Sequence, residues 1–232
     1  MRAEMTFADL DCDSVDYVLT TTRNVRRRLD LTRDVPIELI EECIEIAVQA
    51  PTGCNAQTWR FLVVTDPQKR RELAALYTER PADSRNLKAL EQLGITTSYP
   101  EGDPRQLRKG QVMDSALHLG VHLGDVPVLI IACIQGRLEA NNNFVNSSFY
   151  GSILPAAWSL MLALRSRGLA SAWTTVHLEN ESKVAELFHI PSNVTQVALL
   201  PVAFPLGNDF RPAMRLPVRD VIYRDRWGAK SE

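Results

Sequence analysis

Four arginines and one asparagine stand close together in the segment TTRNVRRRLD. They are Arg23, Asn24, Arg26, Arg27 and Arg28. The planar guanidinium group suits bidentate contact with phosphate, and a carboxamide can complete the shell of donors around the phosphate oxygens. The segment is therefore a candidate phosphate site. The alternative is a solvated turn whose arginines pair with nearby acids such as Asp30 and Asp34.

A second candidate is the polar loop APTGCNAQTW, which separates two apolar segments. Pro51 would end the preceding helix, and Gly53 permits a tight backbone. Asn55 and Gln57 supply donors and acceptors that match the N–H and C=O edges of a heterocycle. The alternative is a turn that satisfies only its own backbone, with Trp59 as a core residue.

Two further patterns favour no site. Cys54 has no histidine nearby in the sequence to act as a base, so we interpret it as a small packing residue. Asp114, His118 and His122 are four residues apart, the helical spacing of two-histidine metal sites. The motif lacks the glutamate of zinc proteases and a third ligand, and Gly120 weakens the helix, so we expect a packed or exposed histidine pair and no metal.

Composition excludes several classes of function. The 232 residues are 45% hydrophobic and 23% charged with a net charge of −2, which indicates a globular protein and suggests neither nucleic acid nor an anionic membrane as a partner. The four cysteines form no Cys-x-x-Cys pair, which is typical of reduced thiols in a cytoplasmic protein. Acids near the N-terminus argue against a secretory signal, and no apolar run has the length of a membrane span. Motifs of phosphate-loop kinases, Rossmann dehydrogenases and α/β-hydrolases are absent from the sequence.

The elements that would position these residues alternate between helices and buried strands. Hydrophobic periodicity and capping signals predict helices at 14–22, 34–50 with a cap at Asp34, 67–77, 151–168 and 180–190. Apolar runs predict strands at 60–65, 126–134 and 195–204. With no repeat and no linker, residues 1–232 are expected to form one α+β domain.

Two segments do not fit this regular pattern. Residues 80–110 are polar and punctuated by proline and glycine, so we expect a mobile, lid-like excursion with at most one short helix. The tail, 208–232, contains too many prolines and arginines for a core element. It should extend along the surface or across a partner subunit.

Residues 21–73 resemble the N-terminal signature of the FMN-dependent nitroreductase family. That signature runs basic-x-Ser-x-basic, a helix after VP, APS-x-x-N-x-QPW-x-F, a strand and an Asp-Pro turn. Residues 168–207, followed by RPAMRLPV, resemble the C-terminal half of the family. The chain departs from the family pattern at Thr22, Asn24, Thr58 and Val176.

The resemblance implies a three-layer α+β fold, with a central, mostly antiparallel sheet flanked by helices, and an intertwined homodimer with FMN at the subunit interface. It places the FMN phosphate on Arg23, Asn24, Arg26 and Arg215, with help from Arg27 or Arg211. It places the isoalloxazine ring and ribityl chain on a loop of the other subunit, at Pro51, Thr52, Gly53, Cys54 and Asn55. Thr174 and Thr175 fall where a backbone N–H of the family approaches flavin N5.

By the same resemblance, NADH or NADPH would reduce the FMN, which would then reduce a small-molecule substrate such as a nitroaromatic or a quinone. Such chemistry belongs to the cofactor, so no catalytic acid or base is expected from the chain. Two alternatives stay open. One is a specialised reaction of the family, either reductive dehalogenation or oxidative dehydrogenation of a peptide-like product. The other is a flavin- or metal-binding module without turnover.

Overall fold

A computed structural model describes residues 9–79, 92, 99–138 and 142–229. The chain divides into two units, one of residues 24–208 and one of residues 1–23 with 209–232. The single domain expected over residues 1–232 stays a prediction. The smaller unit contains helix α1 (Cys12–Thr21) and a short turn of helix, η5 (Val218–Asp220). In the described part of the tail the backbone is otherwise free of regular helix and strand.

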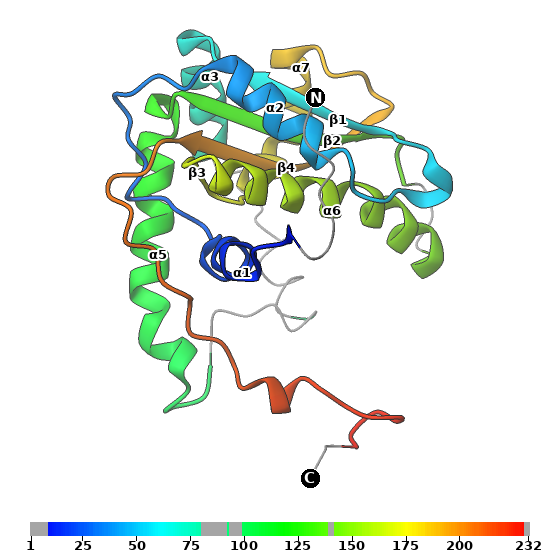
Figure 1. The fold of residues 1–232 in the computed structure, drawn as a ribbon. Helices are drawn as coiled ribbons and strands as arrows, with labels where there is room; N and C mark the ends of the chain where they lie inside the picture. The colour runs from blue at the N-terminus through cyan, green and yellow to red at the C-terminus, as the bar shows by residue number, and fades with distance from the viewer. Residues whose placement is uncertain (1–8, 80–91, 93–98, 139–141, 230–232) are drawn as a thin grey trace. The chain divides into compact units, whose positions relative to one another are not determined.

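The larger unit is built on a four-stranded antiparallel sheet in the order β1-β2-β4-β3 (Figure 1). Its strands are β1 (Trp59–Val64), β2 (Val128–Gln135), β3 (Ala170–Ser171) and β4 (Val194–Ala203). Every residue of β2 from Val128 to Ile134 is buried. Since successive side chains of a strand point to opposite faces, both faces of the sheet are covered. This confirms the expected α+β fold with a central antiparallel sheet.

Helices α2 (Ile37–Ala47) and α6 (Asn143–Ser166) cover one face of the sheet. The apolar core on this face joins Ile40 of α2, Leu160 of α6, Ile130 of β2 and Leu200 of β4. The remaining elements of this unit are η2 (Gly53–Asn55), α3 (Pro67–Thr78), α5 (Pro104–His122), η3 (Leu123–Asp125), η4 (Val176–Asn180) and α7 (Glu181–Phe188). In Figure 1 α3 and α7 lie behind the strands, on the side away from α2.

Several helix boundaries differ from the sequence predictions, and α2, for example, ends at Ala47 rather than at residue 50. Helix α2 begins at Ile37 directly after Pro36, so Asp34 is not its cap. Helix α6 begins at Asn143 rather than at residue 151, and its first turn is capped by the Asn142 side chain, which accepts a hydrogen bond from the Val145 N–H at 3.2 Å. By length and composition alone α6 could span a membrane, but much of its surface is buried in the core described above.

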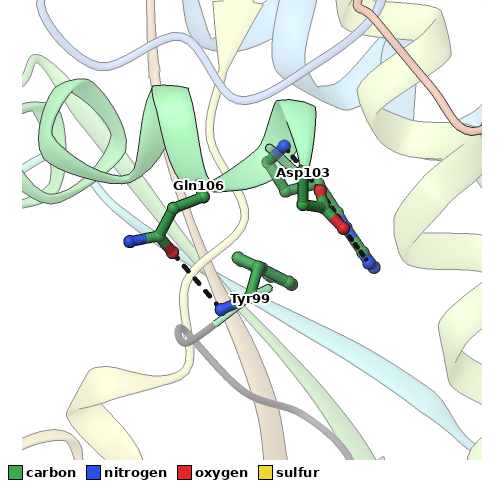
Figure 2. A network of polar contacts seen from close by, with 4 residues as sticks. Tyr99, Asp103 and Gln106 are labelled. Carbon is green, nitrogen blue, oxygen red and sulfur yellow. Dashed lines mark hydrogen bonds and ion pairs between the residues drawn. The ribbon is translucent and has the colours of Figure 1, made fainter. Parts of the chain in front are cut away.

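The expected excursion at 80–110 is shorter than predicted at its C-terminal end. Its stretches 80–91 and 93–98 lie outside the described residues. From Pro104 onward the chain is already helical, because Asp103 caps the first turn of α5 by accepting a hydrogen bond from the Arg105 N–H at 2.8 Å (Figure 2). Hydrogen bonds from the Arg105 side chain lower the pKa of Asp103 to about 2. The Tyr99 N–H donates to Gln106 Oε1 at 3.3 Å and ties the preceding segment to the same turn.

Candidate functional site

The basic turn that follows α1 is held against β3 and the segment after it. The Val25 N–H donates to the Ser171 carbonyl at 2.9 Å. The Asn24 Oδ1 atom accepts from the Trp173 N–H at 2.6 Å. Asn24, one of the expected phosphate ligands, therefore joins the turn to the Thr174–Thr175 segment. Asn24 is exposed, and in the described residues its amide nitrogen makes no hydrogen bond.

Arg26 and Arg27 lie against neutral acceptors of α5. Arg26 Nη1 donates to Ser115 Oγ at 3.3 Å, and Arg27 Nη2 donates to the Asp114 carbonyl at 3.4 Å. Asp30, proposed above as an alternative partner, instead accepts from the Thr32 N–H and hydroxyl at 3.0 and 2.7 Å. Over the described ranges neither Arg26 nor Arg27 has a carboxylate partner.

The environment of Arg26 favours an anionic ligand. Burial lowers the pKa of its guanidinium group, and the nearby Tyr77 partly offsets this effect. The half-buried Arg26 guanidinium has lost part of its hydration, and no carboxylate of the described residues compensates for that loss. A phosphate group would restore that lost stabilisation through charge-assisted hydrogen bonds.

Thr174 and Thr175 present different groups. The Thr174 N–H donates to the Leu199 carbonyl at 3.0 Å, and the Leu199 N–H returns a bond of 2.8 Å. The Thr174 hydroxyl is buried and shares a 2.9 Å hydrogen bond with the Tyr77 hydroxyl. Thr175 is exposed, and its N–H has no acceptor within the described part of the chain. Of the two residues, Thr175 is thus the one that can donate a backbone hydrogen bond to a ligand.

The loop at 51–57 is tightly folded and exposed. Its Asn55 N–H donates to the Thr52 carbonyl at 3.1 Å, and its Gln57 side chain donates to Asn55 Oδ1 at 3.0 Å. Cys54, Asn55 and Gln57 have φ angles of 52°, 54° and 52°. The loop therefore satisfies part of its own backbone, but not only its own, because the Gly53 N–H donates to Ser152 of α6. Pro51, Gly53, Cys54 and Asn55 are exposed.

Two tryptophans, one next to this loop and one next to the Thr174–Thr175 segment, pack against the same apolar cluster. Trp59 is the first residue of β1, shortly after the loop, and Trp173 precedes Thr174. Both are partly buried and pack against the same apolar cluster, which includes Ile134 of β2 and Ile153 of α6. This also agrees with the interpretation of Trp59 as a core residue.

The three remaining arginines of the expected site belong to the smaller unit. Arg23 follows α1, Arg211 and Arg215 lie in the tail, and Arg215 Nη1 donates to the Met214 carbonyl at 3.1 Å. Their roles in phosphate binding stay predictions.

The histidine stripe occurs on α5 as its spacing predicts. The rings of His118 and His122 have centroids 4.5 Å apart, and burial lowers the pKa of His118. In the residues that the structure describes, no group of three histidine, cysteine or carboxylate side chains is arranged to hold a metal ion.

Three side chains that support these segments were not predicted from the sequence. Ser115, Tyr77 and Ser152 each contact a candidate site residue through a hydrogen bond. Only Ser152 had a visible signal, since Ser148 and Ser152 are polar residues one turn apart at the start of an otherwise apolar run.

Comparison with known proteins places this geometry in context. The chain is 26% identical over 211 residues to a Methanothermobacter thermautotrophicus protein that carries the name NADH dehydrogenase/NAD(P)H nitroreductase, covering 90% of this chain and 85% of that protein. It is 28% identical over 203 residues to mouse iodotyrosine deiodinase 1, covering 86% of this chain and 66% of the deiodinase. A crystal structure of oxidised iodotyrosine deiodinase bound to FMN and 3-iodo-L-tyrosine has a similar fold, with a TM-score of 0.58 and 24% identity over 90% of this chain and 98% of that one.

A sequence model of the nitroreductase family matches residues 19–207 of this chain. The matched range includes the basic turn, the loop at 51–57 and the Thr174–Thr175 segment. The chain therefore belongs to the nitroreductase family.

Proposed function

We propose that this protein is an FMN-dependent oxidoreductase that uses NADH or NADPH to reduce a small acceptor such as a nitroaromatic or a quinone. The observation that carries the proposal is the pair of arginines, Arg26 and Arg27, which in the described residues have no carboxylate partner. They lie on a turn that is bonded to Trp173, two residues before the exposed Thr175. A cationic turn close to a lone backbone donor fits a ligand that has a phosphate at one end and a hydrogen-bonding ring at the other.

Different residues of the site would bind different parts of FMN. Arg26 and Arg27, with Arg23 and Arg215, would neutralise the phosphate, and Asn24 would add a neutral donor. The Thr175 N–H would donate to the flavin near N5, where a fixed dipole tunes the electron affinity of the ring. The loop at 51–57 would offer its carboxamides to the polar edge of the ring.

When bound, FMN would supply the hydride and electron chemistry. The chain would position it and hold the nicotinamide or the acceptor against it. The name of the Methanothermobacter relative supports NAD(P)H as the reductant.

Reductive dehalogenation is the second candidate. It is supported by the similarity to mouse iodotyrosine deiodinase 1, of which this chain spans about two thirds. An iodinated phenol would then replace the nitroaromatic as the acceptor. Release of iodide from 3-iodo-L-tyrosine by the reduced protein would distinguish this reaction from nitro or quinone reduction.

We also propose that the active form is a homodimer. Large apolar side chains are exposed on α6, including Phe144 at 80% and Trp158 at 41%. Exposed apolar groups on one helix are typical of a protein interface. A second copy of the chain would cover them and could bring its own 51–57 loop to the site.

The assignment of the phosphate site is tested by titrating the apoprotein with FMN. Arg26→Ala, Arg23→Ala and Arg215→Ala should each weaken binding by about 1.5 to 3 kcal/mol, the size of a charge-assisted hydrogen bond. Arg71→Ala, an exposed arginine of α3, is the control and should bind like wild type. Wild-type affinity in all three site variants would contradict the assignment.

A further inference from the structure

The 51–57 loop is joined to α6 by a hydrogen bond to a buried serine. The Gly53 N–H donates to Ser152 Oγ at 2.9 Å, and 99 residues separate the two positions in the chain. Ser152 is only 5% exposed, so water competes little for this bond. The contact links the start of η2 directly to the helix that covers the sheet.

The direction of the Ser152 hydroxyl is fixed by a second bond. Its Oγ donates to the Ser148 carbonyl, one helical turn earlier, at 2.8 Å. A serine hydroxyl has one proton, so this bond uses the only donor and leaves the oxygen lone pairs for Gly53. Ser152 therefore acts as an oriented acceptor for the loop.

The loop needs such an anchor because its backbone is strained. Cys54, Asn55 and Gln57 all adopt the left-handed region, which non-glycine residues other than asparagine and aspartate rarely occupy. Strained backbone of this kind persists only where surrounding contacts over-determine it, and it is common at ligand sites. The bonds inside the loop, at Thr52 and Asn55, cannot fix its position relative to the core.

We propose that Ser152 is a positioning residue that presets the 51–57 loop for the flavin ring. This inference rests on the proposed FMN-dependent function. Because Ser152 uses the Gly53 N–H, the loop's contacts with the ring would come from its other exposed groups, above all the Asn55 and Gln57 carboxamides. A preset loop avoids the entropy cost of ordering at the moment of binding.

The test compares Ser152→Ala with Ser166→Ala, a matched control near the other end of α6. Ser166 makes the same kind of bond to its own helix, from Oγ to the Ala163 carbonyl at 2.9 Å, with no contact to the loop. Three quantities are measured below the melting temperature. They are amide hydrogen exchange of residues 53–57 in the apoprotein, and the dissociation constant of FMN together with the absorption spectrum of the bound flavin.

Ser152→Ala should speed exchange in the loop by roughly three- to tenfold and weaken FMN binding by a similar factor, as expected for loss of one hydrogen bond. It should also shift the bound-flavin spectrum, which a merely structural loss would leave unchanged. Ser166→Ala should match wild type in all three measurements. If Ser152→Ala does not fold, Ser152→Cys replaces it, since sulfur is a poor acceptor of similar size.

Wild-type exchange, affinity and spectrum in the Ser152 variant would overturn the inference. Faster loop exchange with unchanged FMN affinity and spectrum would also overturn it, because the loop would then not be preset for the flavin. Failure of the wild-type protein to bind FMN would instead refute the proposed function, and the role of Ser152 in ordering the loop would then be judged by the exchange data alone.

Discussion

His177, on η4 just after Thr175, is fully buried, and neither of its ring nitrogens has a hydrogen-bond partner in the part of the chain that the structure describes. Burial lowers its pKa from 6.5 to about 4. A neutral imidazole is tolerated in such a site, whereas a charged one would lose its hydration without compensation. The protonation state of His177 is therefore coupled to folding.

We expect this coupling to appear as a loss of stability in mild acid. Between pH 6.5 and about 4 the unfolded chain binds a proton at His177 that the folded chain does not, so the free energy of unfolding decreases as the pH falls through this window. The full effect is about 3 kcal/mol. Urea denaturation at a series of pH values should show a shallower decrease for His177→Leu than for wild type.

His189→Asn is the control for that experiment. His189 is exposed and has a φ of 54°, a conformation that asparagine also accepts, so the variant should keep the wild-type dependence on pH. Equal pH dependence in wild type and His177→Leu would show that His177 is not responsible.

At the scale of single elements, local patterns predicted the strands and most helices well. β1, α3 and β4 fall within a residue or two of their predicted bounds, because short apolar runs and an Asp-Pro start are strong local signals. The start of α6 was missed because the polar residues of NNNFVNSS resemble a loop. β3 was missed because two residues carry no periodicity.

The candidate site was predictable in part only. The types of Arg26, Asn24 and Asn55 indicated what they could bind. The contacts that orient the site join residues far apart in the chain, such as Asn24 with Trp173 and Tyr77 with Thr174, at separations of 149 and 97 residues. Such pairings arise from tertiary packing and leave no local pattern.

The start of α3 supplies a test at this scale. The Asp66 side chain accepts a hydrogen bond from the Lys69 N–H at 2.8 Å, directly before Pro67. Asp66→Ala should lower the free energy of unfolding by about 1 kcal/mol, since a helix N–H loses its partner. Asp66→Asn keeps a side-chain oxygen and should stay close to wild type in chemical denaturation. Equal losses in both variants would rule out capping as the cause.

For the whole molecule, the proposed homodimer makes a prediction about size in solution. The substitutions Phe144→Glu and Trp158→Glu each place a carboxylate on the exposed apolar surface of α6. They should shift the protein toward monomer, because an unpaired carboxylate buried in the interface opposes association. Light scattering after size-exclusion chromatography measures the mass. Arg71→Glu, at an exposed position of α3, is the control and should leave the mass unchanged. A wild-type protein of monomer mass would contradict the proposal.

Electron transfer through a bound flavin can be followed in the visible spectrum of the protein. FMN is added to the protein, unbound FMN is removed, and the visible flavin spectrum is followed without oxygen as NADH or NADPH is added. We predict that the flavin spectrum bleaches and that a nitroaromatic or a quinone then restores it. A protein that retains no FMN, or whose bound flavin stays oxidised with both nicotinamides, would contradict the account.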